Sequence, residues 1–258
     1  MKARLLVCLA LAALCQPCCA ELSEVPLIGR WENLASSSSE VNRLSRERYR
    51  DALADFAARR RLDDDRQIGK RVAAISARLI AEAIAIKPSS KNWAWEVHTT
   101  SDPDVDAYCM AGGKLLVGSA FVKRLNLTDG ELAVLIAHEI AHAVAEHQRE
   151  ELFEVGRLDG RSGLTPAVLM AQLDADISMQ LRLEGLSSRQ ESEADELGMI
   201  MAGRAGWAGR DMVDFYRKLA GSETASLFSG AYPSMSSRLS MAQGMAKLLE
   251  AQKRGAGS

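Results

Sequence analysis

The chain has 258 residues, of which 47% are hydrophobic and 26% are charged, and its formal net charge is −2. This balance is typical of a globular protein that is long enough to bury a sizeable core. The small net charge and the lack of a long basic run argue against a nucleic-acid-binding protein or a polybasic membrane anchor.

The first twenty residues, MKARLLVCLALAALCQPCCA, have the pattern of a secretory signal peptide. Two basic residues precede an apolar run from Leu5 to Leu14, which is too short to span a bilayer. Cleavage after Ala20 would place small side chains at the positions where a signal-peptide cleavage site requires them. A lipoprotein signal is the alternative, because cysteines are present, but the residues before them fit a lipidation box poorly.

This pattern predicts export, most simply to a bacterial periplasm. We expect residues 1–20 to be removed, residues 21–39 to form a linker and residues 40–258 to form one domain. Only Cys109 would remain after cleavage, so the exported chain could form no internal disulfide. No later stretch is long and apolar enough to predict a transmembrane segment.

Two amphipathic helices are predicted first, over Val41–Arg61 and Asp63–Ile86, because apolar residues recur there at helical spacing. Asn92–Thr100 alternates and is rich in aromatic and β-branched residues, which predicts a strand, and Gly112–Ser119 predicts a second. The pattern predicts further helices over residues 119–125, 129–148, 166–183, 188–204, 209–220 and 234–251. The elements together predict an α+β fold, mostly helical, with one small sheet.

The segment AVLIAHEIAHAVAEH, which ends at His147, places histidines and a glutamate in an otherwise apolar helix. His138 and His142 are four residues apart, so both rings project from one helical face, and Glu139 flanks that face. This is the H-E-x-x-H pattern, in which two imidazoles bind zinc and the glutamate is the general base. We therefore predict one Zn²⁺ per chain, held by His138 and His142, with Glu139 as the catalytic base.

A catalytic zinc site needs a third protein ligand and an open position for water. In the later segment SSRQESEADELG, Glu191 and Asp195 share a helical face. Glu191 could bind the metal while Asp195 holds the outer N–H of a ligand histidine. Glu193 competes with Glu191, because the two point about 200° apart and only one can face the metal. We interpret His98 as a structural strand residue and His147 as a solvated residue at a helix end.

These motifs, in this order, resemble the gluzincin metalloproteases of the HtpX and CAAX prenyl protease type. H-E-I-A-H is followed about fifty residues later by E-S-E-A-D-E-L-G, and the similarity runs from Trp93 to Arg238. It is closest to the soluble periplasmic branch that contains BepA and LoiP, with the mitochondrial Oma-type protease as a cousin. The resemblance implies that Glu191 is the third zinc ligand and that Asp195 supports His138.

The resemblance also implies a zincin-like domain in which an edge strand of the small sheet lines the active-site cleft. We expect that edge at Leu115, Leu116, Val117 and Gly118, whose open backbone groups would pair with an extended substrate. The family usually has a histidine where this chain has Tyr232. We interpret Tyr232 as an oxyanion donor, with a self-inhibitory metal ligand and simple packing as alternatives.

The sequence thus predicts a zinc-dependent endopeptidase that cleaves misfolded or misassembled cell-envelope proteins. The alternatives are a chaperone-like protein with zinc as a structural clip, and a processing protease for one partner. Glu139 argues against the chaperone, because a structural zinc site has no need of a base. Residues 151–186, between the two zinc-binding helices, are interpreted either as a lid over the cleft or as ordinary packing.

Overall fold

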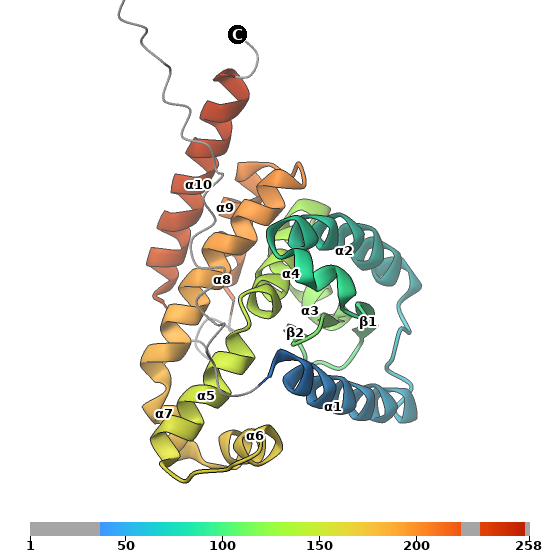
Figure 1. Cartoon of the computed structure of the whole chain (residues 1–258). Helices are drawn as coiled ribbons and strands as arrows, with labels where there is room; N and C mark the ends of the chain where they lie inside the picture. The colour runs from blue at the N-terminus through green and yellow to red at the C-terminus, as the bar shows by residue number, and fades with distance from the viewer. Residues whose placement is uncertain (1–36, 223–232, 256–258) are drawn as a thin grey trace, which may run out of the picture.

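A computed structural model describes residues 37–222 and 233–255 of the chain (Figure 1). The predicted signal peptide at residues 1–20, most of the predicted linker and Tyr232 lie outside the described residues. None of the helices within residues 37–222 and 233–255 combines the length and the hydropathy that a bilayer crossing requires.

Helices make up most of the fold, as the sequence predicts. They are α1 (Ser38–Ala58), α2 (Arg66–Ile86), the short 3-10 helix η1 (Pro88–Asn92), α3 (Ser119–Arg124), α4 (Asp129–Val144), α5 (His147–Asp159), α6 (Pro166–Ala175), α7 (Ile177–Arg182), α8 (Glu184–Arg204), α9 (Gly209–Ala220) and α10 (Met235–Gly255).

Helix α4 lies at the centre of the fold, and α2, α8 and α9 pack against it, with α10 along α8 and α9 (Figure 1). Apolar side chains of these five helices form most of the main core. The start of α4 is fixed by a capping box, in which the Thr128 hydroxyl accepts from the Glu131 amide and the Glu131 carboxylate accepts from the Thr128 amide. Almost every side chain of α4 is buried, so the polar groups it carries must be paired.

The small sheet has the strand order β1-β3-β2. β3 (Lys114–Gly118) is its middle strand and pairs in parallel with β1 (Glu96–Thr100) and in antiparallel with β2 (Ala107–Met110). The expectation that Leu115–Gly118 is the edge strand is therefore wrong, because β3 pairs on both sides and all its residues are buried. The edge next to α4 is β2, a four-residue strand that the sequence pattern did not predict.

The predicted helix over residues 129–148 is in fact two helices that meet at a sharp break. α4 ends at Val144, Glu146 takes the left-handed conformation with a φ of 58°, and α5 begins at His147. A non-glycine residue in that conformation cannot continue a right-handed helix. The break turns His147 inward, so it is only 2% exposed, and its interpretation as a solvated residue is wrong.

Residues 151–186 contain most of α5 and all of α6 and α7. With part of α1 these helices enclose a second, smaller apolar core that includes Leu152, Leu169 and Met179. Only Glu151 of this segment lines the cleft described below. The structure thus favours packing over a lid for this segment.

Candidate active site

Side chains from α4 and α8 converge at one point, where His138, His142 and Glu191 each offer a ligand atom within 4.8 Å of the other two. The Nε2 atoms of the two histidines are 3.1 Å apart. The two carboxylate oxygens of Glu191 face different histidines: Oε2 lies 3.3 Å from Nε2 of His138, and Oε1 lies 3.4 Å from Nε2 of His142. Atoms placed tetrahedrally at about 2.0–2.1 Å from a zinc ion would be about 3.4 Å apart. The three residues therefore fit a tetrahedral metal site and leave a fourth position for water or substrate.

The close approach of α8 to α4 brings Glu191 to the histidines. Gly198, two turns after Glu191 on α8, lies directly against the backbone of His138. A Cβ atom at Gly198 would be 2.8 Å from the amide nitrogen and 2.9 Å from the Cα atom of His138. Only glycine allows the two helices to meet at this distance, so Gly198 helps to set the spacing of the site.

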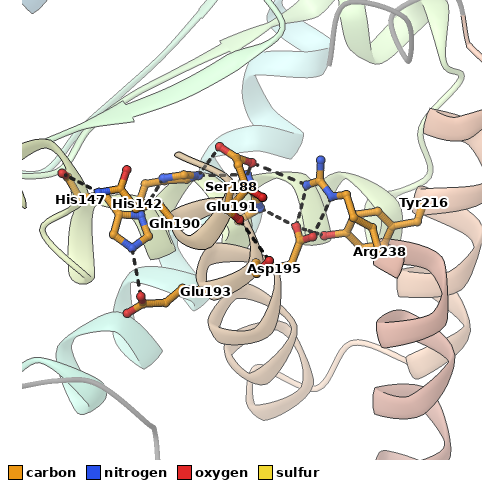
Figure 2. A network of polar contacts seen from close by, with 11 residues as sticks. His142, His147, Ser188, Gln190, Glu191, Glu193, Asp195, Tyr216 and Arg238 are labelled. Carbon is orange, nitrogen blue, oxygen red and sulfur yellow. Dashed lines mark hydrogen bonds and ion pairs between the residues drawn. The ribbon is translucent and has the colours of Figure 1, made fainter. Parts of the chain in front are cut away.

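Asp195 stands behind His138, with its Oδ1 atom 2.9 Å from His138 Nδ1. The Tyr216 hydroxyl donates to Asp195 at 2.6 Å, and the Arg238 guanidinium donates to both carboxylate oxygens at 2.6 and 2.7 Å (Figure 2). Burial would raise the pKa of Asp195, but its contacts with His138 and Arg238 lower that pKa to about 2. An anionic Asp195 keeps a hydrogen on His138 Nδ1, so Nε2 is the nitrogen that a metal would bind. Burial lowers the pKa of His138, but the Asp195 and Glu191 carboxylates outweigh burial and raise that pKa to about 10, so a bound metal would displace a proton from Nε2.

His142 is backed by a second histidine rather than by a carboxylate. Its Nδ1 atom lies 2.9 Å from Nδ1 of His147, and Nε2 of His147 lies 3.7 Å from the Glu193 carboxylate (Figure 2). Burial, together with the charges of His138 and other nearby groups, holds the pKa of His142 well below 6.5. His142 is therefore neutral, which is the form that binds metals. Glu193 contacts His147 and is not part of the three-residue cluster.

The cluster of His138, His142 and Glu191 lies in a cleft of about 600 Å³. One wall is formed by β2 and the residues before it, and the other by α4. Glu139 lines this cleft, and burial raises the pKa of its carboxyl to about 7, with His138 lowering it and Glu191 raising it. Such a carboxyl can take up and release a proton near neutral pH.

One predicted site feature stands elsewhere, and the interpretation of His98 as a structural strand residue agrees with the structure. Leu115–Gly118 do not line the cleft, since β2 lies there instead. His98 is on β1, where its Nδ1 atom lies 2.6 Å from the Asp63 carboxylate, and it is not among the cleft residues either. Sequence reasoning also missed Tyr216 and Arg238 as partners of Asp195, because no local spacing links these three positions.

The sequence of the chain matches a known peptidase family. Residues 66–246 match the sequence model described as peptidase family M48. The chain belongs to peptidase family M48. The resemblance inferred from the motifs is thereby confirmed, and membership of M48 places the chain among the metallopeptidases.

Three M48 relatives illustrate the branch. The mitochondrial metalloendopeptidase OMA1 of Arabidopsis thaliana is 32% identical over 130 residues, which cover 48% of this chain and 26% of the relative. OMA1 of Schizosaccharomyces pombe is 26% identical over 218 residues, covering 76% and 62%. The beta-barrel assembly-enhancing protease of Yersinia pestis is 24% identical over 155 residues, covering 55% and 31%. The M48 chain thus spans less than two thirds of the length of each relative.

Proposed function

We propose that this M48 chain is a zinc-dependent endopeptidase, with His138, His142 and Glu191 as zinc ligands and Glu139 as the general base. The observation that carries the proposal is that His138, His142 and Glu191 each offer one ligand atom within 4.8 Å of the other two, in a cleft that Glu139 also lines. When bound, a zinc ion would lower the pKa of a water molecule to about 7 and polarise the scissile carbonyl.

Glu139 has the proton-transfer role. It accepts a proton from the attacking water and passes it to the leaving amine. Its carboxyl has a pKa of about 7 in the metal-free protein. A bound cation adds positive charge beside it and lowers that pKa, so Glu139 is an acceptor at neutral pH. A structural zinc clip would need no such group, which favours the peptidase over the chaperone-like alternative.

The β2 edge supports an extended polypeptide as the substrate. β2 pairs with β3 on one side and lines the cleft, so its second row of backbone groups can pair with a peptide strand. Backbone pairing selects for extended conformation more than for sequence, which suits unfolded chains. We extend the proposal to misfolded or misassembled cell-envelope proteins in the periplasm, supported by the signal-peptide pattern and by the named role of the Yersinia pestis relative.

The test is cleavage of unfolded casein by the purified chain from Glu21 onward, with and without a chelator. We expect cleavage that stops with the chelator and returns with added zinc. Glu139→Gln should keep its zinc and lose cleavage. Cleavage that resists the chelator, or that survives in Glu139→Gln at the wild-type rate, would contradict the proposal.

A further inference from the structure

We propose that His147 and Glu193, here called the His147–Glu193 pair, position the metal ligand His142. The pair would support His142 as Asp195 supports His138, although Asp195 has more hydrogen-bond partners. This inference rests on the proposed metal site and concerns how the site is held, whichever substrate it serves.

The tautomers of the two rings follow from the distances. Nε2 of His142 faces Nε2 of His138 at 3.1 Å and Glu191 at 3.4 Å, so this nitrogen must be unprotonated to bind a metal. The ring hydrogen of neutral His142 is then on Nδ1, which is 2.9 Å from Nδ1 of His147. His147 must accept that hydrogen bond, and its own hydrogen is therefore on Nε2.

The hydrogen on His147 Nε2 points into a buried region. Among the described residues, no hydrogen bond of normal length reaches this nitrogen. The Glu193 carboxylate lies 3.7 Å away and is 8% exposed, so it offsets the buried N–H by charge rather than by a direct hydrogen bond. Contacts thus run from Glu193 through His147 to the back of His142.

The backbone of His147 is fixed from two directions. Gln190 on α8 donates to the His147 carbonyl at 3.2 Å and to the Glu150 carboxylate at 2.9 Å. On the other side, Glu146 at the helix break contacts Lys87 at 3.0 Å and accepts from Arg149 at 2.6 Å. Gln190 directly precedes Glu191 on α8. This helix therefore supplies the ligand Glu191 and also holds His147, the residue behind the ligand His142.

A purely structural role would require His147 only to fill space. A positioning role requires an acceptor at Nδ1. His147→Asn keeps an oxygen near the position of Nδ1, whereas His147→Leu fills a similar volume without an acceptor. His98→Leu is the matched control, because His98 also has a carboxylate partner, Asp63, but does not line the cleft.

The experiment measures the zinc affinity of each purified variant by competition with a chelator, alongside the melting temperature of the metal-free form. His147→Leu should bind zinc about ten- to a hundred-fold more weakly than wild type, the usual range for a lost partner of a ligand histidine. His147→Asn should recover most of that loss, Glu193→Gln should lose less than His147→Leu, and His98→Leu should match wild type. Equal zinc affinities of wild type and His147→Leu, or of the Asn and Leu variants, would overturn the inference.

Nitrogen NMR of the zinc-loaded wild type gives a test that needs no variant. The inference requires a protonated Nδ1 on His142 and a protonated Nε2 on His147, and a protonated Nδ1 on His147 would refute it even if His147→Leu fails to fold. A wild type that binds zinc but cleaves no substrate would refute the proposed function and leave this inference standing. A wild type that binds no zinc would refute both.

Discussion

Gly198 offers the sharpest test of how the site is spaced, because its helix contains a matched control. Gly198→Ala adds one methyl group 2.8–2.9 Å from the backbone of His138, and backbone cannot rotate out of the way as a side chain can. Normal contact needs about 3.5 Å or more, so α8 must move away from α4 by roughly 0.6 Å. Overpacking of this kind costs about 1–3 kcal/mol.

Gly185→Ala is the same substitution on the same helix, at a position where nothing lies within 4 Å of the new methyl group. Both variants gain the helix propensity of alanine, up to about 1 kcal/mol, and that gain largely cancels in the comparison. Urea unfolding in the presence of a chelator should therefore find Gly198→Ala less stable than Gly185→Ala by about 1–3 kcal/mol.

Zinc affinity is the second readout. The ligand atom of Glu191 moves with α8, whereas both histidines stay on α4, so the zinc affinity of Gly198→Ala should fall at least tenfold while that of Gly185→Ala stays unchanged. If the two variants agree within about 0.5 kcal/mol and bind zinc equally well, the close contact of α4 and α8 does not set the ligand spacing.

Other predictions concern single groups of the site. Glu139→Gln should retain full zinc content by metal analysis while casein cleavage falls by about 10²–10⁴. Glu191→Ala should lose zinc outright, whereas Glu193→Ala should keep most of it; the reverse order would assign the third ligand to Glu193. Asp195→Asn should destabilise the metal-free chain by about 3–5 kcal/mol, because it removes the carboxylate closest to the buried Arg238 guanidinium, and should also weaken zinc binding. Asp102 is a buried carboxylate that pairs with arginines and does not line the cleft. Asp102→Asn should therefore lower the stability of the chain and leave its zinc affinity unchanged. The pKa of Asp195 is lowered from 3.8 to about 2, so its contribution to stability is complete above pH 4 and is lost as pH falls toward 2. The free energy of unfolding of wild type should therefore fall more steeply between pH 4 and pH 2 than that of Asp195→Asn.

The parts of the fold that depend on local periodicity could be predicted from the sequence. α9 falls on the predicted residues 209–220, and α4 begins at residue 129, where the predicted helix begins. The pairing of His138 with His142 follows from one turn of helix. Sheet order could not be predicted, because Ala107–Met110 is too short to show alternation, and missing β2 led to the wrong edge strand.

The surroundings of the site depend on contacts that no spacing rule describes. His147 faces inward only because Glu146 takes a left-handed conformation. A glutamate in the sequence gives no reason to predict that conformation. In the E-S-E-A-D segment, helical angle alone indicated that Glu191 and Asp195 share a face and that only one of Glu191 and Glu193 can face the metal. It did not decide between the two glutamates. Their partners, Arg238 and Tyr216 for Asp195 and His147 for Glu193, come from other helices.

The contact between Arg238 and Asp195 also bears on when the protein becomes competent during its synthesis. Arg238 lies 43 residues after Asp195, at the start of α10, and closes the cluster behind His138. A growing chain in which α4 and α8 have already emerged from the ribosome still lacks this guanidinium. The Asp195 carboxylate then has only part of its hydrogen-bonding shell, and His138 is less firmly oriented. The cluster behind His138 is therefore complete only after α10 has been synthesised and has packed against α8.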